Sequence, residues 1–170
     1  AARDAFEQAL SLRGQSPGPV SDAWTRTAIE LADLLDGQGL REPSAAWRRR
    51  IVEHLERDDP DSLALAAQLN ELAMGDLARK AYGPARELLA RALPIVEDRA
   101  GPRSLDTARV VANQALVLEA QGDSGQAQPL HARALEIYRE QGAVPEALLG
   151  QAQALNYLAA RVYRQRRFGQ

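Results

Sequence analysis

Apolar residues recur along the chain at the three- and four-residue spacing that marks one face of an α-helix. In residues 102–141, Val111, Ala115 and Leu118 form one such face, and Gly122 follows at a place where a helix is expected to end. A second apolar face comes next, at Ala127, Leu130, Ala134, Leu135 and Ile137. The pattern therefore predicts two antiparallel helices joined by a short turn.

This pattern returns at a fixed interval. The string ARALPIV begins at Ala90 and ARALEIY begins at Ala132, a shift of 42 residues. Residues 60–101 and 102–143 share many identities under this shift. In the first copy the recurring positions are Pro60, Ser62, Leu63, Ala66, Ala73, Ala78, Gly83, Ala85, Leu88, Ala90, Arg91, Ala92, Leu93 and Ile95. A period of this size predicts a stacked array of helix pairs rather than a fold around one core.

We expect a single all-α domain over residues 1–170, divided into units of one helix pair each. The expected units are the second helix of a partial repeat at 3–17, full repeats at 19–59, 60–101 and 102–143, and the first helix of a truncated repeat at 144–170. Because both ends fall inside a unit, we expect the array to continue beyond the chain or its flanking helices to be disordered.

Composition supports helices and narrows the chemistry. Hydrophobic residues make up 45% of the chain but aromatic residues only 5%, and the net charge is -2. Basic residues do not outnumber acidic ones, which argues against nucleic-acid binding. No apolar run is long enough to span a membrane. Cysteine is absent and the only histidines are His54 and His131. We therefore expect no metal site, no cofactor and no catalytic site, so that the protein is not an enzyme.

The motifs resemble the tetratricopeptide repeat, in the 42-residue variety found in kinesin light chains and many bacterial proteins. The matching segments are NELA (70–73), AYGPARELLARALPI (81–95), NQALVLEAQGDSGQAQPLHARALEI (113–137) and NYLAARVYRQRRFGQ (156–170). The chain departs from the family's pattern at Ser44, Trp47, Gln114 and Pro94. The resemblance implies a right-handed α-solenoid whose first helices line a concave groove that holds a peptide or a partner helix.

The family's groove positions carry over to a set of polar and aromatic residues. They are Asn70, Glu71, Arg109, Asn113, Asn156 and Tyr157. An asparagine side chain both donates and accepts, so it can bind the backbone of an extended peptide. The alternative is that these asparagines make local hydrogen bonds near helix starts.

Arg109 and Asn113 lie one helical turn apart, where each could hold one carboxylate oxygen. In family members that clamp a terminal carboxylate, lysines occupy positions that here are Ala67 and Gln153, so we do not expect a full clamp.

Two arginine-rich runs and one histidine have competing interpretations. We interpret WRRR (47–50) as a solvated helix face anchored by a buried Trp47 rather than as a patch for anions. We interpret RQRRF (164–168) as a turn beside an exposed end rather than as a phosphate site. His131 is expected at a solvent-facing or interhelix position.

The sequence therefore predicts a non-catalytic protein–protein interaction module that binds a peptide or partner helix in its groove and scaffolds an assembly. The alternative is a regulatory or sensor domain of a larger bacterial signalling or transcription protein. Self-association is a further kind of partner, because Leu155, Leu158 and Val162 lack a covering second helix. We expect a bacterial source and a cytoplasmic location, or a periplasmic one if a leader was removed.

Overall fold

The computed structural model describes residues 22–168, and the expected helix at 3–17 lies outside this part of the chain. All secondary structure in the described part is helical, which confirms the all-α prediction. The helices are α2 (Asp22–Gly37), α3 (Arg41–Asp58), α4 (Leu63–Ala78), α5 (Tyr82–Arg99), α6 (Leu105–Gln121), α7 (Ser124–Glu140) and α8 (Pro145–Phe168).

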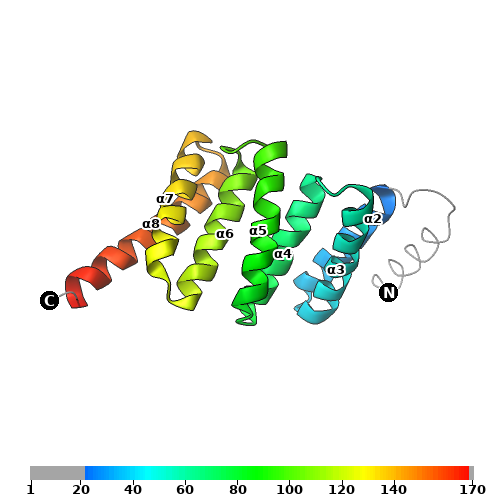
Figure 1. The fold of residues 1–170 in the computed structure, drawn as a ribbon, viewed down its shortest axis with the longest axis horizontal. Helices are drawn as coiled ribbons and strands as arrows, with labels where there is room; N and C mark the ends of the chain where they lie inside the picture. Colours follow the sequence, from blue (N-terminus) through cyan, green and yellow to red (C-terminus); the bar gives the residue numbers. More distant parts are fainter. Residues whose placement is uncertain (1–21, 169–170) are drawn as a thin grey trace.

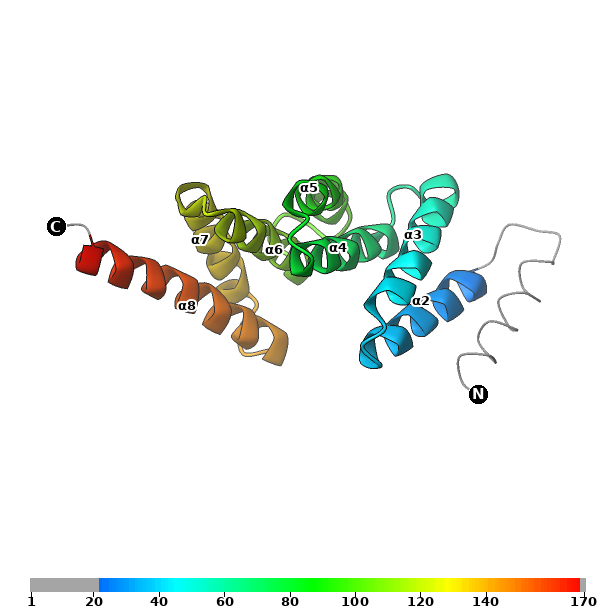
Figure 2. The ribbon, with the colours of Figure 1, turned by 90° about the horizontal axis from the view of Figure 1, so that it is seen from below.

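The helices stack side by side in chain order (Figure 1). Figure 2 shows them as an arch, with α3, α5 and α7 along its outer side and α4 and α6 on its inner side. On the inner side α4 contacts α6, and α6 contacts α8. Among the described helices α2 and α4 do not contact each other, so the first pair joins the array through α3 alone.

Short local signals set the helix ends. The hydroxyl oxygens of Ser62 and Ser104 accept hydrogen bonds from backbone N–H groups of the first helical turn, each at 3.2 Å. These caps satisfy donors that the helix itself leaves without partners. At the other end of α6, Gly122 adopts a φ of 87°, a left-handed conformation that glycine enters without strain. Pro94 lies on the exposed side of α5, and the helix continues through it.

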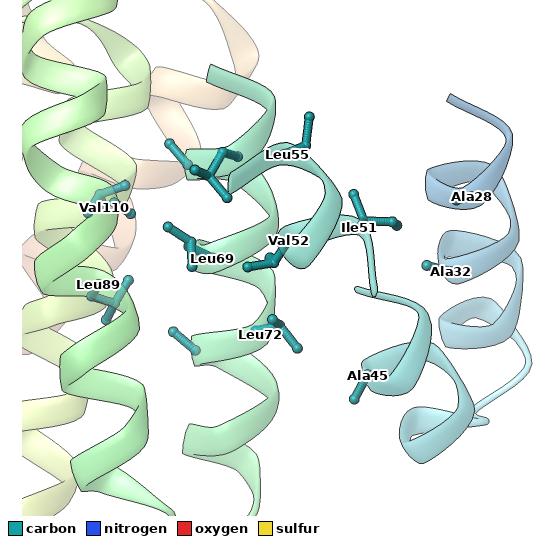
Figure 3. Close-up of a cluster of buried hydrophobic side chains, with 14 of the residues drawn as sticks. Ala28, Ala32, Ala45, Ile51, Val52, Leu55, Leu69, Leu72, Leu89 and Val110 are labelled. Carbon is teal, nitrogen blue, oxygen red and sulfur yellow. The ribbon is translucent and has the colours of Figure 1, made fainter. Parts of the chain in front are cut away.

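Alanines allow the helices of a pair to pack closely. In α5, Ala85 and Ala92 are completely buried, and so are their counterparts Ala127 and Ala134 in α7. Larger apolar side chains fill the space between units. Figure 3 shows Val52, Leu55, Leu69 and Leu72 between α3 and α4, with Leu89 and Val110 farther along the array. The core is therefore a continuous layer that runs through the stack rather than one central cluster.

The arginine of the repeated ARAL string links one unit to the unit before it. Arg91 of α5 pairs with Glu56 of α3, and Arg133 of α7 pairs with Glu97 of α5. These arginine side chains are substantially exposed, so each pair contributes ~1 kcal/mol at most. The repeated string thus places one buried alanine, Ala92 or Ala134, and an exposed inter-unit ion pair on the same helix.

The WRRR segment differs from its sequence-based interpretation, because Arg48 and not Trp47 is the buried residue. Arg48 is 5% exposed and donates to Asp33 at 2.7 Å, Asp36 at 2.8 Å and Gln68 at 2.8 Å. These partners lie on α2 and α4, so one guanidinium joins two helices that do not contact each other. Its burial is tolerated because the two carboxylates balance its charge and, with the amide oxygen of Gln68, accept hydrogen bonds from its N–H groups.

Candidate functional site

The joint between α7 and α8 departs from the repeat at paired positions. A shift of 42 residues places His131 where α5 has Leu89, and Tyr138 where it has Val96. The same shift places Tyr157 of α8 where α6 has the buried Ala115. Among the contacts between successive helices from α5 to α8, the contact between α7 and α8 is therefore the one where aromatic rings replace aliphatic side chains.

These rings border a pocket whose lining residues lie on α6, α7 and α8. We call it the α6–α8 pocket, and its volume is about 290 Å³. It is lined by Arg109, Ala112, Asn113, Leu116, His131, Tyr138, Glu146, Leu149, Gly150, Gln153, Ala154 and Tyr157. The walls are largely apolar, with a few polar groups that could fix the orientation of a bound group.

Gly150 allows the large ring of Tyr138 to fit against α8. A Cβ atom at position 150 would lie 2.4 Å from Cζ of the Tyr138 ring, closer than such atoms approach. The repeat equivalents of Gly150 are the alanines Ala66 and Ala108. Tyr138 is itself buried, and burial raises the pKa of its hydroxyl. A larger side chain on α7 is thus matched by a smaller one on α8.

His131 forms the back of the pocket and is 2% exposed. Its ring stacks on that of Tyr157, with ring centroids 4.6 Å apart and planes 9° apart. Neither Nδ1 nor Nε2 has a hydrogen-bond partner within residues 22–168. Burial lowers the pKa of the imidazole, and the charge of Glu119 on α6 opposes that shift. The neutral ring therefore holds one donor and one acceptor nitrogen without partners.

Arg109 lines the same pocket from α6, and acidic neighbours balance its positive charge. Its Nη2 donates to Asp106 at 2.7 Å, and its Nη1 lies 3.6 Å from Glu146 of α8. Its Nε is buried and has no hydrogen-bond partner among the described residues. Arg109 thus lines the pocket with its positive charge already balanced by Asp106 and Glu146.

The asparagines expected to bind a peptide lie in different settings. Asn113 lines the pocket, but its Nδ2 donates to Oδ1 of Asn70 at 2.8 Å. Asn70 is 2% exposed, so this pair fastens α4 to α6 from within the array. Asn156 is exposed on α8 outside the pocket lining. The bond between Asn70 and Asn113 spans two units and is not one of the local bonds considered as the alternative.

Of the other residues derived from the resemblance, Arg109 and Tyr157 line the α6–α8 pocket together with Asn113. Glu71 lies apart, in a second pocket of about 440 Å³ between α3 and α4. There Arg79 pairs with Glu42 at 2.6 Å, so the charged groups of that pocket partly satisfy each other.

Sequence reasoning missed His131 and Tyr138 as pocket residues. The signal that would have found them is the 42-residue comparison itself, which shows polar aromatic rings where the preceding unit has Leu89 and Val96.

Two further observations concern the described residues as a whole. No group of three or more histidine, cysteine or acidic side chains within 22–168 could hold a metal ion. In the same part of the chain, no helix combines the length and apolar character that crossing a membrane requires.

Comparison with known proteins finds a family match over the middle of the chain. Residues 63–140 match the family model described as tetratricopeptide repeat. The sequence has no match among curated proteins. Tetratricopeptide repeats serve generally as non-catalytic scaffolds for protein–protein interaction, through the extended surfaces that stacked helix pairs create.

Solved structures of low sequence identity share the fold. BtubC (BKLC) from P. vanneervenii is similar with a TM-score of 0.73 and 22% identity, over 97% of this chain and 72% of that chain. Nearly identical TPR-like repeats of kinesin light chain type from Podosopora anserina have a TM-score of 0.74 and 18% identity, over 97% and 80%. MamA has a TM-score of 0.56 and 15% identity, over 95% and 90%.

The family match covers the helices α4 to α7, and the structural likeness extends over nearly all of the chain. Residues 63–140 therefore belong to the tetratricopeptide repeat family, and the chain has the fold of an all-α tetratricopeptide-like solenoid.

Proposed function

We propose that this protein binds a segment of a polypeptide partner along the inner side of the arch, and that the α6–α8 pocket receives one of the segment's side chains. The observation that carries the proposal is the pocket itself, which opens between two successive first helices. Its volume of about 290 Å³ lies just below the range of ~300–1,000 Å³ that is usual for ligand pockets. It therefore suits one large side chain better than a cofactor.

The surroundings of the pocket support an extended ligand. Leu149 is 61% exposed on the pocket's rim, and Leu148 beside it is 49% exposed. Leu116 of α6 lines the opposite wall. A polypeptide segment that crosses from α6 to α8 would cover this apolar surface while its polar groups meet Gln153 and Arg109.

A photo-crosslinking experiment tests this proposal without breaking the fold. A photoreactive phenylalanine analogue would replace Gln153 at the pocket or, as the control, Gln128 on α7; both residues are exposed. The full-length protein would be irradiated in lysate of its source, and crosslinked peptides would be identified by mass spectrometry. We expect one recurring segment at position 153 that is absent at position 128.

The outcomes separate the alternatives. A recurring segment from another protein supports the scaffold function. A segment from elsewhere in the same polypeptide supports the regulatory alternative, in which the array holds another domain of its own protein. Equal crosslinking at 128 and 153 would contradict binding on the inner side.

A variant of the pocket rim adds an independent test. Leu149→Asp places a charge on an exposed side chain, so it should leave folding intact and abolish the crosslink at position 153.

A further inference from the structure

The missing contact between α2 and α4 leaves part of α4 uncovered. Where α6 meets α4, Asn113 bonds Asn70, whereas α2 and α4 do not contact each other. Glu71 corresponds to Asn113 after the shift of 42 residues, and it is exposed and forms no hydrogen bond or ion pair with the described residues. Glu71 lines the pocket of about 440 Å³ between α3 and α4, which we call the α3–α4 pocket.

Gly75 of α4 leaves space in this pocket. The corresponding residue of α6 is Val117, which is completely buried. A Cβ atom at position 75 would meet nothing within 4 Å, so no close approach requires glycine there. The backbone does not require it either, because the left-handed residue at the end of α4 is Lys80. Glycine within a helix lowers stability relative to alanine, and its effect here is to leave volume that a ligand can fill.

Negative charge exceeds positive charge around the α3–α4 pocket. Two of the arginines that line it, Arg48 and Arg79, each pair with two carboxylates. These carboxylates belong to Asp33, Asp36, Glu42 and Asp76. The remaining charged residues of the lining are Arg41 and Glu71, one of each sign. The surplus of carboxylates attracts a cation and repels an anion.

The acidic side chains that line the pocket are accessible and can accept further hydrogen bonds. Asp36 accepts from Arg48 through Oδ2, and its Oδ1 has no partner among the described residues. Glu42 accepts from Arg79 through Oε1, and its Oε2 is likewise without a partner in that part of the chain. With Glu71 they come from three helices, and all three residues are exposed.

The arrangement of these carboxylates suits an extended organic cation. Within residues 22–168, no three acidic or histidine side chains converge so that they could hold a metal ion. A guanidinium group carries five N–H donors in a planar fork, so it can reach acceptors on more than one helix, as Arg48 does within the chain. The apolar lining residues Leu72 and Met74 offer a surface for the methylene groups of such a side chain.

We propose that the α3–α4 pocket receives an arginine side chain of the polypeptide partner. Its guanidinium group lies among the carboxylates of Asp36, Glu42 and Glu71, and its methylene groups fill the volume beside Gly75. The inference rests on the proposed function for the source of the arginine. It adds a second contact, separate from the α6–α8 pocket, and it states the charge of the partner's side chain.

Two probes of nearly equal shape and different charge test this proposal. N-acetylarginine amide carries the guanidinium group, and N-acetylcitrulline amide carries a neutral urea group in its place. Met74 is the only methionine in the sequence, so a ¹³C label on the methionine methyl group reports on the pocket lining by NMR. We expect the arginine probe to shift this signal in a saturable way and the citrulline probe to bind about tenfold more weakly. Equal responses to both probes, or no response to the arginine probe, would overturn the proposal.

Two variants separate the effect of charge from that of volume. Glu71→Gln removes a charge from an exposed side chain, so it should leave the unfolding temperature unchanged and weaken the arginine probe roughly threefold. Gly75→Leu should fill the pocket and abolish the response without lowering the unfolding temperature. Glu87→Gln and Gly83→Leu are the matched controls, at exposed positions on α5 outside the pocket lining. Native binding in both pocket variants would contradict the proposal.

This titration is independent of the crosslinking experiment at position 153. A recurring crosslinked segment without a response at Met74 would retain the proposed function and reject the arginine site. A specific response at Met74 without any crosslinked segment would support the arginine site and reject binding of a segment at the α6–α8 pocket.

Discussion

At the scale of single residues, the α7–α8 joint depends on two matched substitutions relative to the preceding unit. Tyr138 replaces a valine and faces a glycine, and His131 replaces a leucine and stacks on Tyr157. In each case the ring on α7 needs a particular partner on α8. The energetic consequences of both matches can be measured one residue at a time.

Gly150→Ala should destabilise the protein by about 1–3 kcal/mol, the usual cost of forcing extra volume into a packed site. The added Cβ would overlap the ring of Tyr138, which is confined between helices. Gly75→Ala is the matched control, because its Cβ meets nothing within 4 Å. That variant should gain about 0.5–1 kcal/mol from helix propensity. Urea unfolding followed by circular dichroism measures both, and Tyr138→Val should rescue Gly150→Ala.

Stability should fall on acidification because of His131. Its folded-state pKa lies below the usual value of 6.5, mainly through burial, with Glu119 of α6 opposing and Tyr157 of α8 stacked on the ring. Below pH ~6.5 the unfolded chain binds a proton that the folded chain resists, so acidification favours unfolding. We expect the free energy of unfolding to fall more steeply between pH 7.5 and 5.5 for the native protein than for His131→Leu. Parallel pH profiles would contradict a depressed pKa.

At the scale of helices, the array is joined in two different ways. Between α4, α6 and α8, each first helix contacts the next one directly, and Asn70 bonds Asn113 across the first of these contacts. The first pair lacks such a contact, and Arg48 instead spans from α2 across α3 to Gln68 of α4. The first joint therefore depends on one buried guanidinium more than the later joints depend on any single side chain.

Arg48→Lys should destabilise this joint, since an ammonium group cannot reach Asp33, Asp36 and Gln68 together. The expected loss is about 1–3 kcal/mol, because both carboxylates are partly exposed and regain water. Hydrogen exchange should show the largest increase in the amides of α2. Arg49→Lys, at the exposed neighbouring position, is the control and should change neither quantity. Uniform faster exchange along the whole array would contradict a local joint.

At the scale of the whole molecule, exposed apolar side chains gather on the last described helix. They lie on α8 and just before it, at Val144, Leu148, Leu149, Leu155, Tyr157, Val162 and Tyr163. Elsewhere in the described chain, the large hydrophobic side chains with comparable exposure are Leu40 and Leu63. This apolar surface on α8 favours contact between copies of the chain 1–170 through that helix.

We expect the chain 1–170 to self-associate at high concentration, and Leu155→Glu with Val162→Glu to abolish this. Both side chains are about half exposed, so the charges should cost the folded state little. Light scattering over a concentration series measures the mass, and Leu40→Glu is the control that should leave association unchanged. A native protein that stays monomeric at every concentration would contradict the expectation.

The amino-acid sequence by itself determines the helices and their repetition, because apolar spacing, serine caps and glycine stops are local signals that act within one unit. Its 42-residue period also indicates the family, since that interval is a property of the order of the residues alone. The tertiary structure alone decides which polar side chains meet. It buries Arg48 in place of Trp47, pairs Asn70 with Asn113, and leaves both ring nitrogens of His131 without partners among the described residues. Each of these outcomes depends on a neighbouring helix many residues away, and no local pattern encodes that distance.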